Sequence, residues 1–256
     1  MNDWDKHEIA KKYQAGLLNA SSQPYLLEFV APPVTPGLDH AVESWRDAGN
    51  NPFPANDLIS NKVGVFDYDE ERNTIACFPI SWGQKITMTL PHIRPKLPPN
   101  ESFYYLSVCG IVRTIDNHLL LSCRSKAVNN YQGMWHASIA GTLDIATAKS
   151  SRTVFPQFFQ EMEEELQIYP SHIIKVNQLG LCKYLIPNSA SFEVCMSAQV
   201  SLTAKEVLER AKDAKDSWEG TIHAFTPEEA TRMLSLESKE RFVPGGAATL
   251  ILKLGL

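Results

Sequence analysis

Long hydrophobic runs are missing from this sequence. No segment approaches the roughly 18 consecutive apolar residues that a membrane-spanning helix requires. The first residues, Met1 to Glu8, are charged with both signs, and no apolar core follows them. They do not resemble a secretion signal. We therefore expect a protein without a membrane partner.

Basic residues are not in excess. The chain has 24 lysines and arginines against 29 aspartates and glutamates, a net charge of −5. A protein that binds duplex nucleic acid by neutralising its phosphates normally shows a basic stripe. Because this sequence shows none, we expect no duplex nucleic acid as a partner.

Cysteines are few and are not arranged in pairs. The chain has five, Cys77, Cys109, Cys123, Cys182 and Cys195, widely spaced and mostly within apolar runs. A structural zinc site needs cysteine or histidine pairs at short spacing. The pattern instead indicates buried free thiols in a reducing compartment. We therefore expect a cytoplasmic protein.

The sequence divides at a cluster of prolines. The 256 residues are enough for one large domain, or for a catalytic domain with a smaller companion. Clustered prolines within 95–100 break both helices and strand ladders. They predict an N-terminal accessory region, 1–98, and a second domain, 103–256.

Periodicity predicts the elements of both parts. In the accessory region we expect helices at 7–19 and 38–47, a β-hairpin from strands at 63–66 and 75–78, and a strand at 85–90, where apolar and polar residues alternate. In the second domain we expect strands at 104–112, 119–123, 177–185, 192–201 and 220–225, and helices at 152–168, at 203–213 and from 226 onward. Strands with interspersed helices predict an α/β or α+β domain.

One predicted helix carries the chemistry. At about 100° per residue, the apolar residues of 154–166 form one stripe. Glu161, Glu164 and Glu165 lie along one flank of it, and Glu163 points away. Three adjacent carboxylates repel one another, and this arrangement suits a hard divalent cation such as Mg²⁺, which prefers oxygen ligands. A solvated acidic face is the alternative.

The surroundings of this helix resemble the signature of the Nudix hydrolase superfamily. The segment 160–168 matches the second half of the signature, with all three family glutamates and both aliphatic positions. Upstream, 133–136 and Ala140-Gly141 resemble the opening of the signature loop. The resemblance covers 103–256. It implies a Nudix-type α/β/α sandwich with a mixed sheet, to which the accessory region adds its β-hairpin.

The match has departures. The signature loop is about five residues longer than in the family. Counting back from the helix places Arg152 and Ala146 where the family has a glutamate and a glycine, and Asp144 is a candidate substitute for that glutamate. Gln160 replaces an arginine that orients a catalytic glutamate, and Gln167 replaces a glycine.

The resemblance implies a reaction and its ligands. The family cleaves, by water attack, a phosphoanhydride bond in a nucleoside diphosphate linked to another group, such as a nucleotide sugar, an ADP-ribose-like compound or a nucleoside triphosphate. Mg²⁺ is the implied cofactor, and Mn²⁺ is an alternative. By matching positions, the metal ligands would be the Gly141 carbonyl and Glu161, Glu164 and Glu165. The general base would be Glu161 or Glu219, and a surface carboxylate is the alternative for Glu219.

Three further residues are candidates for substrate binding. Arg124 ends a strand beside the loop and could clamp a phosphate, although a surface salt bridge is the commoner role. Trp135 and His136 could contact the substrate, or Trp135 could anchor the loop in the core. The accessory region either covers the cleft or forms a homodimer interface. The rival hypotheses are a Nudix-fold nucleotide sensor without turnover and, third, a mutase or isomerase on the same fold.

Overall fold

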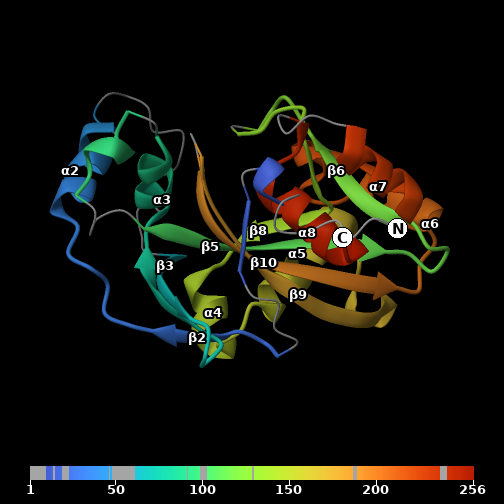
Figure 1. Cartoon of the computed structure of the whole chain (residues 1–256), viewed down its shortest axis with the longest axis horizontal. Helices are drawn as coiled ribbons and strands as arrows, with labels where there is room; N and C mark the ends of the chain where they lie inside the picture. The colour runs from blue at the N-terminus through green and yellow to red at the C-terminus, as the bar shows by residue number, and fades with distance from the viewer. Residues whose placement is uncertain are drawn as a thin grey trace.

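The computed structural model describes residues 10–13, 15–18, 23–45, 47, 61–90, 92–98, 103–128, 130–186, 189–236 and 241–256. Across these residues the strands form one mixed sheet of eleven strands, with helices on both faces (Figure 1). The α/β/α sandwich expected from the sequence is therefore confirmed.

Seven strands follow one another across the sheet. Their order is β1 (Gly16–Leu18), β9 (Ile173–Ile186), β10 (Ser189–Val200), β5 (Tyr104–Arg113), β3 (Lys62–Asp69), β4 (Thr74–Ile80) and β2 (Leu26–Phe29). The β10–β5 and β2–β4 pairs are parallel, and the other pairs of this path are antiparallel.

Four further strands join the sheet beside this path. They are β6 (Leu119–Arg124), β7 (Trp135–Ala137), β8 (Ile139–Thr142) and β11 (Gly220–Phe225). β8 pairs with β5, and β6 pairs with β5, β7 and β11. β6 therefore lies between β7, which carries part of the signature loop, and β11, which spans 220–225.

The helices lie in three groups. One face of the sheet carries α4 (Ile145–Ser151), α5 (Phe155–Leu166) and α6 (Ala204–Ala211), and the other carries α7 (Pro227–Leu236) and α8 (Pro244–Leu254). Helices α2 (Pro36–Trp45) and α3 (Trp82–Thr89) lie at the end of the molecule near β3 (Figure 1). Short 3₁₀ turns occur at η3 (Arg94–Lys96), η5 (Pro170–His172) and η6 (Ser217–Glu219).

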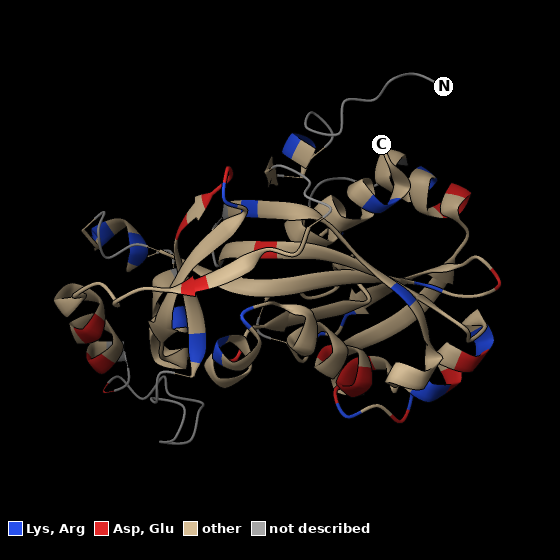
Figure 2. Cartoon of the chain, turned by 90° about the horizontal axis from the view of Figure 1, so that it is seen from below, with Lys and Arg blue, Asp and Glu red and all other residues tan. Residues whose placement is uncertain are grey.

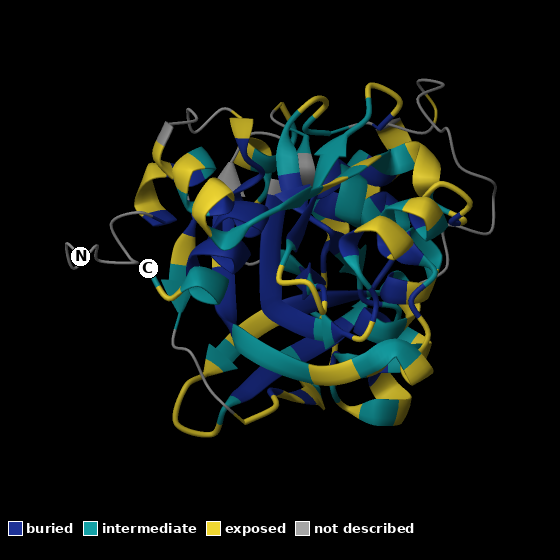
Figure 3. Ribbon diagram, turned by 90° about the vertical axis from the view of Figure 1, so that its right-hand side faces the viewer, coloured by how far each residue is buried: buried dark blue, intermediate teal, exposed yellow. Residues whose placement is uncertain are grey.

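Strand β5 lies at the centre of the core. Leu106 and Val108 join the cluster that contains α5, whereas Cys109 and Ile111 join the cluster that contains α8. This alternation follows from the two-residue period of a strand that is buried on both faces. Figure 3 shows the central strands buried and the exposed residues on outer helices and loops.

Helix α5 packs directly on the β5 backbone. A Cβ atom added at Gly110 would lie 2.2 Å from Cε2 of Phe158, which is fully buried. The apolar stripe of α5, with Met162 and Leu166 also fully buried, therefore fixes the rotation of the helix against the sheet. That rotation decides where its glutamates point.

Charged positions of both signs are interspersed along the elements visible in Figure 2. An exposed pair such as Arg72 and Glu28, 3.2 Å apart, adds little stability. Stability therefore depends mainly on the buried core. No helix in the described part of the chain is long and apolar enough to cross a membrane.

Several predicted elements are confirmed. The hairpin forms from β3 and β4, β11 spans 220–225, and α2 covers most of 38–47. All five cysteines are free thiols, and four of them are buried, as expected; Cys123 is partly exposed.

Two element predictions are wrong in whole or in part, and one helix was not predicted. Among the described residues of 7–19, only 10–12 are helical, and 16–18 pair with β9, because that long strand offers a backbone ladder. The predicted strand at 85–90 is instead helix α3. The helix predicted at 152–168 is confirmed as α5, whereas α4, which ends at the left-handed Arg152 (φ 53°), was not predicted.

The accessory hairpin belongs to the main sheet. Gly64 and Val65 of β3 pair with Tyr105 and Tyr104 of β5. The proposed boundary between 98 and 103 therefore separates two parts of one continuous sheet. Through this pairing, α3 lies beside the strands that carry the signature loop.

Candidate active site

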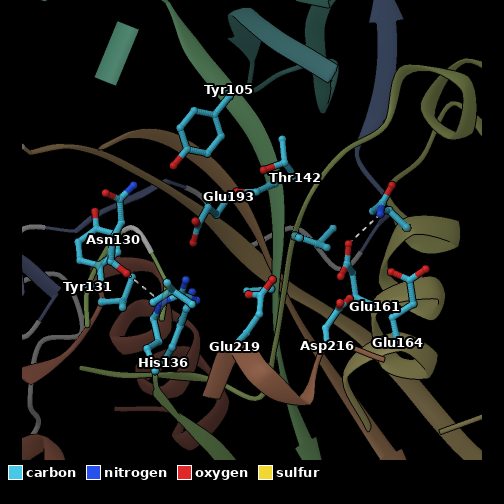
Figure 4. Close-up of a pocket in the computed structure, with 18 of the residues that line it drawn as sticks. Tyr105, Asn130, Tyr131, His136, Thr142, Glu161, Glu164, Glu193, Asp216 and Glu219 are labelled. Carbon is cyan, nitrogen blue, oxygen red and sulfur yellow. Dashed lines mark hydrogen bonds between the residues drawn. The ribbon is translucent and has the colours of Figure 1, made fainter. Parts of the chain in front are cut away.

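A cavity of about 610 Å³ opens where the two parts of the chain meet. Helix α5, strand β8 and turn η6 form one side, and β3 and α3 contribute to the other (Figure 4). Six of the eight predicted site residues line it: Arg124, His136, Gly141, Glu161, Glu164 and Glu219. The other two, Glu165 and Trp135, do not line it. The fold thus brings together residues that lie up to 95 positions apart (219 − 124).

The α5 glutamates occupy the positions predicted from helical periodicity. Glu161, Glu164 and Glu165 are partly or mostly buried beside the apolar stripe, whereas Glu163 is exposed. In Figure 4, Glu161 and Glu164 project from α5 toward the cavity, with Asp216 beside them. A freely solvated acidic face is therefore not what the structure shows.

Glycine at position 141 allows the closest of these approaches. The pairing of β8 with β5 sets Gly141 opposite Val108 and against α5. A Cβ atom at this position would lie 1.9 Å from Oε1 of Glu161. Any larger residue would displace this carboxylate, so the glycine of the predicted signature has a direct steric role.

Glu161 is held in a poorly solvated position. Its Oε1 accepts a hydrogen bond from Nε2 of Gln157 at 2.8 Å. Burial raises the pKa of Glu161 to about 7, a shift that Gln157 partly opposes and that Glu164 and Glu219 increase. The charged form of this carboxylate is therefore disfavoured unless a positive charge lies beside it.

Glu165 lies behind the cavity wall. Its Oε1 accepts a hydrogen bond from the backbone N–H of Ala140 at 3.1 Å, which ties α5 to β8. Burial, and then the charge of Glu161, raise the pKa of Glu165 well above its usual value. Two neighbouring carboxylates thus share a region of low solvation, and neither has a basic side chain bonded to it among the described residues.

Glu164 is arranged differently. It forms a 2.8 Å ion pair with Lys215 and accepts a 3.2 Å hydrogen bond from Gln160. Burial alone would raise the pKa of Glu164, but these two partners outweigh it, and the pKa is lowered. Gln160, which replaces the family arginine, is thus bonded to Glu164 and to neither of the more buried glutamates.

Glu219 and Arg124 face the cavity from η6 and β6. β11, which follows η6 directly, pairs with β6 so that Gly220 lies opposite Arg124. Burial raises the pKa of the Glu219 carboxyl, and the positive charge of Arg124 opposes that shift. Nε of Arg124 also donates to the Asn130 carbonyl at 3.2 Å. In Figure 4, Glu219 lies between the α5 carboxylates and His136.

His136 is buried at the cavity wall. Its Nδ1 accepts a hydrogen bond from the Ala137 N–H at 2.9 Å, so the neutral ring carries its proton on Nε2. Burial, and then the charge of Arg124, lower the pKa of His136 to about 3. The ring is therefore a neutral hydrogen-bond donor.

Trp135 lies away from the cavity. Its ring packs edge-on against His223 and Phe225 of β11, with ring centroids 5.2 and 5.5 Å apart. This is the arrangement of a residue that anchors the loop to the neighbouring strand.

The departures from the signature have clear places in the fold. Asp144 lines the cavity, where it is ion-paired with Lys62. Arg152 is exposed at the end of α4 and does not line the cavity. Gln167, at the family's glycine position, has φ 51° and ends α5 in the left-handed conformation that glycine favours.

The sequence prediction did not identify Glu193, a cavity residue from β10. Glu193 is 5% exposed and accepts hydrogen bonds from the Tyr184 hydroxyl at 2.7 Å and the Ser191 hydroxyl at 3.0 Å. The sequence does contain a signal for it, because Glu193 is the single acidic residue in a mostly apolar strand. A buried charge at such a position is costly unless it is hydrogen-bonded.

The sequence prediction also did not identify Lys85, a cavity residue from α3. The incorrect strand assignment for 85–90 gave it no defined neighbours. The available signal was Ser81 followed three residues later by Gln84, the pattern of a helix capping box. The structure contains that box, with both reciprocal hydrogen bonds.

The donor chemistry of the site fits a hard divalent cation. Among the described residues, no three histidine, cysteine or acidic side chains converge into a preformed metal-binding group. The available donors at Glu161, Glu165 and the Gly141 carbonyl are nevertheless all oxygens, as Mg²⁺ requires. Both glutamates are withdrawn from water without a basic partner in the described chain, so a cation would offset their repulsion.

Comparison with known proteins gives a partial likeness. No family profile and no curated protein matches the sequence. Among solved structures, the MutT protein from Methanosarcina mazei Go1 matches with TM-score 0.38 and 15% identity, over 59% of this chain and 93% of that one. A NUDIX hydrolase from Nitrosomonas europaea matches with TM-score 0.37 and 14% identity, over 52% and 80%. DR0079 from Deinococcus radiodurans matches with TM-score 0.36 and 17% identity, over 52% and 75%. All three TM-scores are below 0.5, and each likeness covers only part of this chain.

Proposed function

We propose that this chain is a Nudix-type pyrophosphohydrolase that cleaves a phosphoanhydride bond in a nucleoside diphosphate linked to another group. The observation that carries the proposal is the pair Glu161 and Glu165, mostly buried between α5 and β8, with Glu161 against Gly141 at the wall of a large cavity. Buried carboxylates without a basic partner are costly, and the cost is explained if they hold a cation.

Mg²⁺ is the proposed cofactor, with Mn²⁺ as an alternative, and Glu161, Glu165 and the Gly141 carbonyl would hold it. Such an ion neutralises phosphate oxygens and lowers the pKa of an attacking water. Glu164 would become a further ligand of the cation once its ion pair with Lys215 is broken. Of these donors, Glu161, Glu164 and Gly141 line the cavity, and Glu165 lies behind its wall.

The chain's own residues supply the rest of the reaction. A water oxygen forms a bond to one phosphorus while the bridging P–O bond breaks, and the products are a nucleoside monophosphate and a phosphorylated second group. Glu219 faces the cavity and would take the proton from the attacking water. Arg124 would bind a phosphate oxygen, and the Nε2–H of His136 would donate to the substrate.

The test uses a panel of nucleotide sugars, ADP-ribose-like compounds and nucleoside triphosphates, with Mg²⁺ and detection of released monophosphate. The Glu165→Gln variant keeps an acceptor for the Ala140 N–H but loses the charge, and we expect its turnover to fall at least about 100-fold. Glu163→Gln, on the exposed face of the same helix, should change turnover less than about twofold. Equal turnover in both variants would refute the proposal.

Glu219→Gln tests the proposed base. Loss of a general base typically lowers turnover by about 10²–10⁴-fold. We expect such a loss in kcat, with little change in the affinity for pyrophosphate. An unchanged kcat would remove Glu219 from the mechanism and leave Glu161 as the candidate.

A nucleotide sensor is the second candidate function. It is favoured by Glu164, which is already paired with Lys215, and by the uncharged Gln160 beside it. For a sensor, calorimetry would detect binding of a compound from the panel, and no monophosphate would be released with Mg²⁺ or Mn²⁺.

A further inference from the structure

The N-terminal region contributes a mostly buried lysine to the cavity. Lys85, on α3, donates a 2.7 Å hydrogen bond from Nζ to Oγ1 of Thr142. Its Nζ also lies 3.9 Å from the ring centroid of Trp82 and 4.7 Å from that of Tyr105. The ammonium group is thus held in place by one hydroxyl and two aromatic rings.

Lys85 has no acidic partner in the described part of the chain. Lys62, its neighbour on β3, is ion-paired with Asp144, whereas no carboxylate of the described residues lies within ion-pair distance of Lys85. Burial, and then the charge of Lys62, lower the pKa of Lys85 to about 7, against the opposing effect of Glu219 and Glu193. A desolvated cation at a cavity wall favours an anion as its partner.

The position of Lys85 connects it to the candidate site. Thr142, which accepts its hydrogen bond, directly follows Gly141, which contacts Glu161. Lys85 and Glu161 therefore lie beside neighbouring residues of β8 and line the same cavity. A diphosphate bound near Glu161 would bring negative charge toward the ammonium group.

We propose that Lys85 binds a phosphoryl group of the substrate, so that the N-terminal region completes the active site. This inference rests on the proposed pyrophosphohydrolase function, because it takes its ligand from that reaction. The hydrogen bond to Thr142 and the rings of Trp82 and Tyr105 hold the ammonium in place before the ligand arrives. α3 is then part of the binding site and not only a cover for the sheet.

The test is a calorimetric titration of the full chain with inorganic pyrophosphate at fixed Mg²⁺. Lys85→Met removes the charge and keeps the length, and an apolar replacement of a buried unpaired charge is expected to fold. Lys183→Met is the matched control, because Lys183 also lies over an aromatic ring, 4.5 Å from that of Tyr104, but does not line this cavity. We expect pyrophosphate affinity to fall at least about tenfold in Lys85→Met. In Lys183→Met it should change less than about twofold, and Lys85→Arg should restore part of the loss.

The outcomes separate this inference from the proposed function. If no compound of the panel is hydrolysed but pyrophosphate binding depends on Lys85, the phosphoryl site stands and the hydrolase proposal fails. If the panel is hydrolysed while Lys85→Met keeps the wild-type KM and pyrophosphate affinity, the inference about Lys85 is overturned and the hydrolase proposal stands.

Discussion

At the scale of single residues, the contact between Gly141 and Glu161 is the most sensitive point of the site. The clash of an added Cβ is with the flexible end of a glutamate, so Glu161 can move aside without unfolding the chain. We expect Gly141→Ala to keep the circular dichroism spectrum and melting behaviour of the wild type. Its turnover should fall at least about 100-fold, because the displaced Glu161 carboxylate no longer lies beside Gly141, where the two would hold the cation. Wild-type turnover in a folded Gly141→Ala variant would show that this contact has no functional role.

His136 makes stability depend on pH. The pKa of its ring is lowered from 6.5 to about 3, chiefly by burial. Below pH 6.5 the unfolded chain therefore binds a proton that the folded chain does not. The stabilising contribution is complete above pH 6.5 and is lost as the pH falls toward 3.

Denaturant unfolding of wild type and His136→Gln at about pH 7.5 and about pH 4.5 checks this linkage. The amide side chain introduced in the variant cannot gain a proton, so the free energy of unfolding should fall by on the order of 2 kcal/mol more in the wild type. The comparison uses the difference between two pH values, so a constant destabilisation of the variant does not matter. Parallel pH profiles would mean that His136 takes up its proton in the folded state.

At the scale of elements, the break between α4 and α5 depends on a left-handed residue. Arg152 has φ 53° and an exposed side chain. Glycine adopts this conformation without a steric cost, although it gains more freedom when unfolded. We expect Arg152→Gly to raise the free energy of unfolding by roughly 0.5 kcal/mol. Arg232→Gly, within α7, should lower it by about 1 kcal/mol. Denaturant titration of both variants measures the difference, and equal destabilisation would rule out conformational strain at Arg152.

Helix α3 depends on its cap. Ser81 accepts the Gln84 N–H, and the Gln84 side chain accepts the Ser81 N–H. Loss of such a cap costs about 1 kcal/mol. We expect Ser81→Ala to lower the free energy of unfolding by about that amount and to raise KM more than it lowers kcat, because α3 carries Lys85. An unchanged KM would mean that α3 has no role in binding.

The elements that the sequence predicted correctly are those specified by local pattern. The period of 3.6 residues placed Glu161 on the inner flank of α5 and Glu163 on the outer face, because the apolar stripe that packs on β5 is contained within the helix. The alternation at 85–90 wrongly indicated a strand, because the capping box of Ser81 and Gln84 starts a helix there. The left-handed turn at Arg152 had no glycine to signal it.

At the scale of the whole molecule, the candidate site depends on pairings between distant segments. β10 lies beside β5 through contacts such as Ser191 with Tyr105, 86 positions apart (191 − 105). That pairing brings Glu193 to the cavity, and the β3–β5 pairing brings α3 and Lys85 to it. Periodicity within a segment carries no information about such neighbours. The α5 half of the site was therefore predictable, and the half supplied by α3 and β10 was not.

The proposed hydrolase requires the glutamates of α5 to hold a divalent cation in the folded chain. Electron paramagnetic resonance of Mn²⁺ measures free ion directly, and therefore gives the affinity of the wild type, Glu161→Gln and Glu163→Gln without any assumption about the substrate. We expect bound Mn²⁺ in the wild type, at least about tenfold weaker binding in Glu161→Gln, and wild-type binding in Glu163→Gln. Equal Mn²⁺ binding in all three proteins, or none in the wild type, would contradict this expectation.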